Sequence, residues 1–401
     1  MKIVHIQPYY NDGFGYHENL LPLYQAMQGH EVILLTSTLK SGFNKERVAP
    51  AGEFIDNGFS VKRLPIAGEF KDRFVIFKDL YSELKQQKPD YIFHHHAMSL
   101  SVKVVCKYKK DHPKTFVALD NHADLNITGR YKIWKCLYYN LFWKRFFKKF
   151  DSFVDLYFGV TPLRCLFLEE EMGIKSDKIR LLPLGTDTAK LESFSISKKS
   201  LFSELGIDPS KKIIVHGGKI TPEKKCDRLI QAFSKIDNPD WQLVLFGRIE
   251  HDVIRDLIMK DSRIVYIDWL NREKTISVLK YSDIGIWNTQ HTALLEDAVA
   301  VGLPLILRFY GSTCHLIRKS GFFLYDESTR EIQDKLTFLL EHPTIVEEFK
   351  NNAKELSHTL SYNNVAKESI EYYYDTSPKA LHVEFMNDKY FDRSYPYIRK
   401  I

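Results

Sequence analysis

The sequence lacks long hydrophobic runs, and this absence narrows the class of protein. No apolar run approaches the roughly 18 residues that a membrane-spanning helix requires, and the run after Lys2 is broken by His5, Gln7 and Pro8. We therefore expect no signal peptide and no transmembrane segment. Cysteine is also scarce: the five cysteines are scattered without C-x-x-C spacing, which favours reduced thiols in a cytoplasmic protein over disulfides or a zinc site.

The chain is long enough for two domains, and its charge is unevenly distributed. At 401 residues, with 44% hydrophobic and 27% charged residues, the composition is that of an ordinary globular protein. Residues 1–187 contain 27 Lys and Arg against 21 Asp and Glu, so this part carries the whole net charge of +6. We expect the N-terminal half alone to be attracted to anionic surfaces.

Short apolar runs alternate with helical patterns, first in residues 1–187 and again from residue 211, without internal repeats or low-complexity tracts. This pattern predicts an α/β protein with two Rossmann-like, doubly wound parallel sheets facing a cleft. The expected strands include residues 2–6, 32–35, 89–93, 114–119, 156–160, 241–246, 264–267, 284–287 and 322–324. The expected helices include residues 16–28, 163–172, 293–301, 329–341 and 343–360.

Two glycines, Gly13 and Gly15, stand in the loop after the first expected strand. They do not complete a dinucleotide-binding fingerprint, because no third glycine stands at the required place. A tight turn with positive φ is enough to explain one of them. The other interpretation is that their bare backbone lets a phosphate or a sugar approach closely.

Three consecutive histidines, His94, His95 and His96, follow the strand expected at 89–93. Successive side chains of a strand point to opposite faces, so only His94 and His96 would be able to share an ion. No carboxylate or cysteine completes a site at ligand spacing along the chain. We therefore expect no metal ligand set here.

The segment from Arg130 to Phe150 combines seven basic residues with many aromatic ones and has no acidic residue. Such a helix can lie in a membrane interface, with its rings at the headgroup level and its cations near anionic lipid. A core-packed amphipathic helix with a solvated basic face fits the pattern as well. A nucleic-acid partner is not expected, because no recognised binding motif accompanies the segment.

The stretch from Tyr281 to Leu307 predicts a strand, a polar turn from Asn288 to Thr292, a helix, and a second strand after Pro304. A loop between strand and helix lies at the carboxyl end of a parallel sheet, where open α/β folds bind ligands. The helix N-terminus suits an anion. Glu296, one turn in, would repel a phosphate and is better suited to accept hydrogen bonds from sugar hydroxyls. A first-turn glutamate favoured by the helix dipole is the alternative.

The residues from Glu296 to Pro304 resemble the E-A-x-A-x-G-x-P core of retaining GT-B glycosyltransferases of the family 4 type. That family usually has a second glutamate eight residues earlier, where this chain has Asn288. The resemblance implies that Glu296 binds the ribose of a nucleotide and that Asn288 orients the transferred sugar. It also implies that the turn and the helix N-terminus face the phosphate or the sugar, through Thr292 and the N–H groups of Ala293, Leu294 and Leu295.

The glycine loop at Gly218 resembles the family's G-R-L-x-x-x-K-G pattern, with Lys219 in the place of arginine and Lys224 on the motif lysine. Two cations on such a loop can both reach a diphosphate and neutralise a departing nucleotide. Lysine keeps the charge of arginine but loses its planar fork. In the alternative interpretation both are solvated loop lysines.

The resemblance assigns further residues around the expected cleft. His122 would face the donor sugar from the N-terminal domain, although a loop histidine bonded to Asp120 or Asp124 is the alternative. Asp268, after the strand at 264–267, would meet the nucleotide base. Gly13 and Gly15 would close on the sugar.

The resemblance covers residues 1–374 and implies four segments. They are an acceptor-binding domain at 1–187, a linker at 188–210, a nucleotide-sugar-binding domain at 211–360, and a terminal helix with a tail at 361–401 that crosses back to the first domain.

The sequence therefore leads to a cytoplasmic glycosyltransferase. It would move a sugar from a UDP- or GDP-linked donor to a glycan or lipid-linked acceptor, with retention of configuration, in bacterial surface polysaccharide or glycolipid assembly. Peripheral contact with the inner face of the cell membrane would involve residues 130–150. The chain has no Asp-x-Asp motif, so no cofactor and no bridging metal are expected. A sugar-nucleotide epimerase of the same fold and a catalytically degenerate binding subunit are the alternatives.

Overall fold

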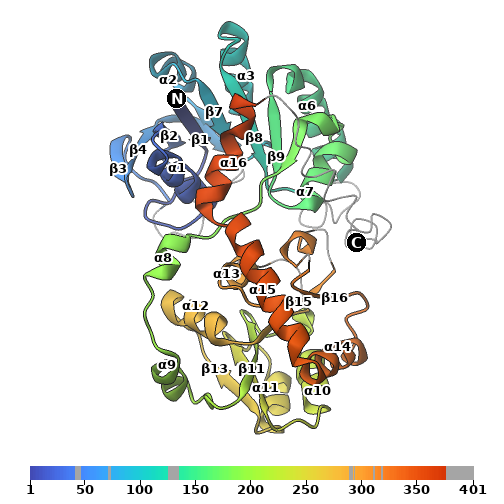
Figure 1. Ribbon diagram of the computed structural model, residues 1–401. Helices are drawn as coiled ribbons and strands as arrows, with labels where there is room; N and C mark the ends of the chain where they lie inside the picture. Colours follow the sequence, from blue (N-terminus) through green and yellow to red (C-terminus); the bar gives the residue numbers. More distant parts are fainter. Residues whose placement is uncertain are drawn as a thin grey trace. The chain divides into compact units, whose positions relative to one another are not determined.

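The chain folds into two α/β units, each with its own parallel sheet (Figure 1). The computed structural model describes residues 1–40, 47–70, 74–124, 135–288, 292, 294–309, 312–317 and 319–375. Unit 1 comprises Met1–Leu184 together with the segment that begins at Tyr362, and unit 2 comprises Gly185–Ser361. The predicted α/β fold with two Rossmann-like sheets is confirmed.

Unit 1 contains an eight-stranded sheet in the order β10-β9-β8-β7-β1-β2-β4-β3, in which only the edge pair β3–β4 is antiparallel. Its strands are β1 (Lys2–Gln7), β2 (Glu31–Ser37), β3 (Gly52–Asp56), β4 (Phe59–Leu64), β7 (Tyr91–His94), β8 (Phe116–Asn121), β9 (Leu156–Gly159) and β10 (Ile179–Leu181). A separate hairpin pairs β5 (Ile66–Phe70) with β6 (Phe74–Phe77). The central strands β1, β7, β8 and β9 are buried almost throughout, as parallel strands between helical layers must be.

The helices of unit 1 include the last helix described in the chain, α16, which lies beside α1 (Figure 1). The α-helices are α1 (His17–Met27), α2 (Leu80–Gln87), α3 (Val102–Asp111), α6 (Lys144–Phe150), α7 (Pro162–Leu166) and α16 (Tyr362–Tyr374). The π-helices are η1 (Lys135–Trp143) and η3 (Phe167–Glu171), and short 3-10 turns are η2 (Asp151–Phe153) and η4 (Ser176–Lys178). Ser369 anchors α16, since it accepts from Gln25 Nε2 at 2.8 Å and its carbonyl accepts from the Tyr91 hydroxyl at 2.6 Å.

Unit 2 contains a six-stranded, fully parallel sheet in the order β13-β12-β11-β14-β15-β16. Its strands are β11 (Lys212–Gly217), β12 (Trp241–Phe246), β13 (Ile264–Ile267), β14 (Ile284–Trp287), β15 (Leu305–Arg308) and β16 (Gly321–Leu324). Its α-helices are α8 (Thr188–Glu192), α9 (Lys198–Leu205), α10 (Cys226–Ser234), α11 (Asp252–Met259), α12 (Arg272–Tyr281), α13 (Leu294–Ala300), α14 (Thr329–Glu341) and α15 (Pro343–Thr359). Two 3-10 turns are η5 (Pro222–Lys224) and η6 (Cys314–Leu316).

Each sheet has one point where the strand order reverses. In unit 1 the chain runs from β1 to β2 on one side and later to β7 on the other side of β1. In unit 2 it runs from β11 to β12 on one side and later to β14 on the other. Ligands of open α/β sheets bind outside the carboxyl ends of the strands at such a point. We therefore expect a ligand-binding site at the loops after β1, β7, β11 and β14.

The range 188–210, expected as a linker, is instead packed structure within unit 2. It contains α8 and α9, and Leu201 and Phe202 of α9 are buried. The Phe202 ring contacts the ring of Tyr281, whose hydroxyl donates to the carbonyl of Ile196 at 2.8 Å. The many serine and lysine residues in this range suggested a linker, although Leu201 and Phe202 are apolar and become buried.

The strands β3, β4, β5 and β6 and the helices α2 and α3 were not among the predicted elements. The helix predicted at 163–172 begins as α7 and continues as the π-helix η3. Within the described ranges, no helix is both long and apolar enough to cross a bilayer.

Candidate active site

The loops after β11 and β14 meet at the switch point of unit 2. Trp287, the last residue of β14, donates from Nε1 to the carbonyl of Gly217 at 3.0 Å. Gly218 follows with φ of +115°, and a Cβ added there would lie 3.8 Å from Leu294 at the start of α13. The structure therefore brings together two of the predicted substrate-binding residues, Gly218 and Leu294.

The two lysines that are predicted to bind phosphate, Lys219 and Lys224, follow Gly218 in this glycine loop. Lys219 is 64% exposed, and its Nζ lies 3.7 Å from Glu250 Oε1. Lys224 ends the 3-10 turn η5, which Thr221 caps by accepting from the Lys224 N–H at 3.3 Å. Both cations lie at the carboxyl edge of β11, and their part in catalysis stays a prediction.

The next residue, Lys225, occupies the place of glycine in the family pattern and retains the conformation that glycine favours, with φ of 56°. Its Nζ forms an ion pair with the buried carboxylate of Glu327, which also pairs with Arg308 Nε. The carbonyl of Glu327 accepts from Arg228 at 3.1 Å. Sequence reasoning did not single out this charged cluster, because its members lie about a hundred residues apart in the chain.

Asn288, directly after β14, is buried, and its two amide atoms have different surroundings. Nδ2 donates to the carbonyl of Glu327 at 3.2 Å. Oδ1 is buried and has no hydrogen-bond partner among the described residues. An unpartnered buried acceptor is costly, and a sugar hydroxyl would satisfy it.

Most residues of α13 are buried. Leu295 is fully buried, and its N–H donates to the carbonyl of Thr292 at 3.0 Å. Glu296 is only 5% exposed. Ala293 lies outside the described residues, so the predicted contact through its N–H has no structural description.

The neighbouring Asp297 fixes α13 to α12. Its carboxylate receives both terminal nitrogens of Arg272, with Nη2 at 2.6 Å from Oδ1. Burial raises the pKa of Asp297, and the Arg272 guanidinium opposes that rise. This bidentate pair holds the helix that carries Glu296 in place.

Asp268 follows β13, which is an edge strand of the sheet and is separated from β11 by β12. Its side chain is exposed and its Oδ1 accepts from the N–H of Trp269 at 2.8 Å. Trp269 is 72% exposed. The pair is accessible to a nucleotide base, and the predicted contact stays a prediction.

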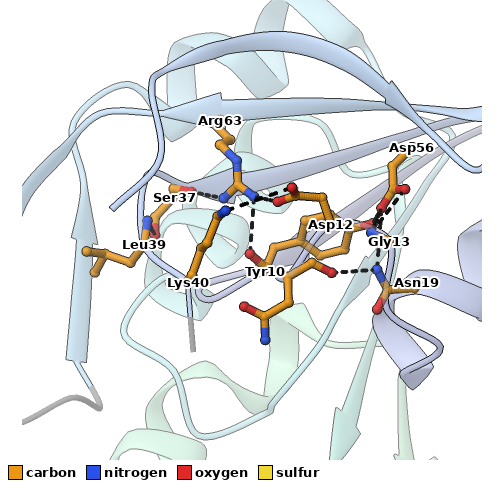
Figure 2. A network of polar contacts seen from close by, with 10 residues as sticks. Tyr10, Asp12, Gly13, Asn19, Ser37, Leu39, Lys40, Asp56 and Arg63 are labelled. Carbon is orange, nitrogen blue, oxygen red and sulfur yellow. Dashed lines mark hydrogen bonds and ion pairs between the residues drawn. The ribbon is translucent and has the colours of Figure 1, made fainter. Parts of the chain in front are cut away.

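In unit 1, the loop after β1 is tied down by charged side chains (Figure 2). Gly13 has φ of +76°, as a tight turn requires, and its N–H donates to Asp56 Oδ2 at 3.1 Å. Arg63 donates to the carbonyl of Tyr10 at 3.1 Å and to the carboxylate of Asp12 (Figure 2). The Gly13 N–H is thus occupied by a carboxylate, whereas a Cβ at Gly15 would meet open space.

His122 follows β8 and lies at the carboxyl edge of the unit 1 sheet. Its Nε2 lies 3.2 Å from Asp120 Oδ2. The alternative interpretation of His122, a loop histidine bonded to a neighbouring aspartate, predicted this contact. The side chain is 24% exposed and its ring lies 4.7 Å from that of His96. His122 therefore has a fixed orientation and an accessible face, and its contact with a sugar stays a prediction.

The same aspartate gathers two further histidines that the sequence did not connect. His17 Nε2 and His95 Nδ1 lie 3.6 and 3.1 Å from Asp120 Oδ2, and all three side chains are buried. Within the described residues, His17, His95 and Asp120 form one group with metal-binding spacing, and His96, Asp120 and His122 form another. Neither group contains two residues of the histidine run. The strand alternation that the sequence suggested for His94 and His96 ends at His94, because β7 ends there and His96 has a positive φ of 67°.

The described part of the basic segment adjoins an apolar hollow of about 510 Å³ in unit 1. Side chains from the β5–β6 hairpin and from η1 line it, among them Phe70, Ile76, Leu137 and Phe142, which are 44–61% exposed. The adjoining helix α6 presents exposed basic side chains, namely Lys144, Arg145, Lys148 and Lys149. Residues 130–134 lie outside the described part.

Comparison with known proteins finds that two glycosyltransferase family models each match a part of the chain. The family described as "Glycosyltransferase Family 4" matches residues 20–190, and the family described as "Glycosyl transferases group 1" matches residues 197–356. An uncharacterised glycosyltransferase of Methanocaldococcus jannaschii is 24% identical over 210 residues, covering 49% of this chain and 54% of that protein. A trehalose synthase of Thermococcus litoralis is 22% identical over 273 residues, covering 61% and 63%.

Each of these matches spans less than two thirds of the relative's length. The solved structure of Anabaena HepE in complex with UDP has a TM-score of 0.63 at 12% identity, covering 93% of this chain and all of that chain. The likeness shows the fold: the chain has the two domains of the GT-B glycosyltransferase architecture, in the expected order.

Proposed function

We propose that this chain, which has the two domains and the fold of a GT-B glycosyltransferase, transfers a sugar from a nucleoside diphosphate to an acceptor. The observation that carries the proposal is that Gly218 lies against Leu294 at the switch point of unit 2, in the two segments after β11 and β14 that also carry Lys224, Asn288 and Glu296. This is the edge at which an open parallel sheet binds a nucleotide.

The residues there suit the parts of a nucleotide sugar. Lys219 and Lys224 supply positive charge for the diphosphate and for the charge that develops as the nucleotide leaves. Glu296 accepts from the ribose hydroxyls, and the Asn288 Oδ1 atom accepts from a hydroxyl of the transferred sugar. The chain contains no Asp-x-Asp motif for a bridging metal, so we assign the neutralisation of the diphosphate to the two lysines.

We extend the proposal to a UDP- or GDP-linked donor and to retention of configuration. HepE, a structural neighbour, was solved with UDP, and retention is what the motif around Glu296 implies. In this proposal His122 would orient the sugar, and Gly13 and Gly15 would close on it.

The acceptor is proposed to be a glycan or a lipid-linked glycan at the cytoplasmic face of a bacterial membrane. The apolar hollow and the four exposed cations of α6 support this, because exposed aromatic and aliphatic side chains beside Lys and Arg favour an anionic lipid interface. The occupant of this surface would be the anionic bilayer itself.

The decisive variant is Lys224→Ala, tested with donor hydrolysis as a turnover assay that needs no acceptor. Turnover should fall at least about tenfold, since one such contact contributes a few kcal/mol to the transition state. Lys235→Ala, which removes an exposed lysine after α10, is the control and should leave turnover unchanged. Equal turnover of both variants would refute the role of Lys224.

A thermal-shift screen with UDP, GDP, ADP and their sugar conjugates identifies the donor. A nucleotide at 100 times its dissociation constant adds about 2.7 kcal/mol to the free energy of unfolding. If no nucleotide stabilises the chain, the binding-subunit alternative replaces the enzyme. If the donor sugar changes identity without an acceptor, the chain is an epimerase.

A further inference from the structure

The carboxylate of Asp120 is fully buried at the end of β8, and three imidazole nitrogens face one of its oxygens. His95 Nδ1, His122 Nε2 and His17 Nε2 lie 3.1, 3.2 and 3.6 Å from Oδ2. The other oxygen, Oδ1, accepts from the backbone N–H of His96 at 2.6 Å. The cluster joins α1, β7 and β8 at the switch point of unit 1.

A chain of hydrogen bonds fixes which nitrogen of His95 carries a proton. Ser369 Oγ donates to the carbonyl of Ala366 at 2.6 Å, so it accepts from Gln25 Nε2, and the amide oxygen of Gln25 faces His5. That oxygen can only accept, so His5 Nε2, 2.6 Å away, is the donor. In a neutral His5 ring that donates from Nε2, the other nitrogen, Nδ1, is the acceptor.

This chain of hydrogen bonds determines the state of the other nitrogen of His95, Nδ1. His95 Nε2, 3.1 Å from His5 Nδ1, must donate, because His5 Nδ1 accepts. In a neutral His95 ring the remaining nitrogen, Nδ1, then carries a lone pair. It faces the carboxylate oxygen of Asp120 at 3.1 Å without a hydrogen between them. A proton or a bound cation is required between these two atoms, and the proton would sit either on His95 as a second proton or on the Asp120 carboxyl.

His17 distinguishes the two possibilities. Its Nδ1 bonds to the hydroxyl of Tyr362 at 3.2 Å, whereas its Nε2 is buried and has no hydrogen-bond partner among the described residues. A proton between His95 and Asp120 would leave His17 Nε2 in this costly state. A metal ion would use the lone pairs of both histidines together with the carboxylate.

We propose that His17, His95 and Asp120 bind one divalent transition-metal ion of the Zn²⁺ class. Their ligand atoms lie within 4.8 Å of one another. The distances of 3.1 and 3.6 Å from Oδ2 bracket about 3.3 Å, the edge of a tetrahedron with metal–ligand bonds of about 2.05 Å. Two imidazoles and a carboxylate are a common zinc ligand set, with a fourth position for water.

The surroundings of the ligands agree with a metal site. Each ligand has a partner on its other polar atom: Tyr362 for His17, His5 for His95, and the His96 N–H for Asp120. Such outer contacts orient metal ligands in proteins.

The site lies within unit 1 and is independent of the proposed diphosphate site in unit 2. It contrasts with the expectation of no metal, which considered only neighbours in the sequence. Because β7 and β8 are adjacent, the carboxylate that seemed missing beside the histidine run is supplied from 25 residues further on.

The test uses the full chain, stripped with a chelator and dialysed, then titrated with Co²⁺ followed by its visible absorption and with Zn²⁺ in competition. We expect one ion per chain, at least tenfold weaker binding in Asp120→Asn, and unchanged binding in His112→Ala. His112 is the matched control, because it follows α3 outside the metal-spaced groups and its side chain bonds to the Tyr108 carbonyl at 3.1 Å.

His17→Asn is the second variant, since His17 is outside the hydrogen-bond chain that orders His95, and it should also bind at least tenfold more weakly. A wild-type chain that binds no Co²⁺ overturns the proposal whatever the variants do. Binding that is as tight in both variants as in wild type also overturns it. In either case a proton, on His95 or on the Asp120 carboxyl, lies between the two groups.

Discussion

Acid should destabilise unit 2 through a buried histidine of β11, His216. Its Nδ1 donates to the carbonyl of Ile286 at 2.8 Å, and Cys226 Sγ lies 3.4 Å from its Nε2. The neutral ring is therefore satisfied on both sides. Burial lowers the pKa of His216 from 6.5 to about 4, and the nearby Lys224 adds to this effect.

The sign and size follow from proton linkage. Below pH 6.5 the unfolded chain binds a proton that the folded unit excludes until the pH approaches 4, so the stability that His216 contributes is complete above pH 6.5 and falls as the pH drops. Between pH 7.5 and pH 5 the loss amounts to about 2 kcal/mol, or about 30-fold in the unfolding equilibrium.

The perturbation is His216→Gln, whose amide can still donate to the Ile286 carbonyl but does not titrate. Amide hydrogen exchange in peptides from β11 and β14, corrected for the intrinsic rate at each pH, reports the local free energy of unfolding. Wild type should lose about 2 kcal/mol more protection than the variant between pH 7.5 and pH 5. Groups that titrate alike in both proteins cancel in this difference, and these include His315, a second buried histidine of unit 2. An equal loss in both proteins would show that His216 is not buried as a neutral ring.

Two further predictions concern the donor loop and the membrane surface. Gly247→Ala should cost about 3 kcal/mol or more in urea unfolding and weaken UDP binding, because φ is +119° and the new Cβ would lie 2.0 Å from the Gly218 carbonyl oxygen. Gly206→Ala, with φ of +68° and no atom within 4 Å, should cost only about 1 kcal/mol, and an equal cost would contradict the clash. Lys148→Glu with Lys149→Glu should weaken partition onto anionic vesicles at least about 30-fold, since each surface cation contributes about 1 kcal/mol; equal binding to zwitterionic vesicles would exclude the anionic interface.

The fold was predictable because the central strands are buried apolar runs, each followed by a loop and a helical segment. Elements that depart from this pattern were missed. The β5–β6 hairpin exposes Phe70 and Ile76, so its residues show no clean division into buried and exposed positions. In α9, only Leu201 and Phe202 are fully buried among polar neighbours, which is too little periodicity to mark a helix.

For the candidate site, the sequence located the loops but not the contacts between them. The motif around Glu296 and the glycine loop at Gly218 are local in the sequence, and a parallel sheet places such loops at one edge. The grouping of His17, His95 and Asp120 depends on which strands are neighbours, and no local pattern encodes that order. The same holds for the occupation of the Gly13 N–H by Asp56, from a strand that was not predicted.

Two of the departures from the family pattern in unit 2, Lys225 and Asn288, meet at one residue, Glu327. Lys225, in the place of glycine, reaches its carboxylate, and Asn288, in the place of glutamate, donates to its carbonyl at 3.2 Å. A glutamate at position 288 would point a carboxylate oxygen at that carbonyl, where only a donor is tolerated. With Glu327 held by Lys225, asparagine is the residue that satisfies the carbonyl and still directs one acceptor oxygen away from it. The substitution therefore exchanges charge for a neutral acceptor beside the proposed diphosphate site, and it leaves the hydrogen-bonding capacity that orientation of a sugar requires.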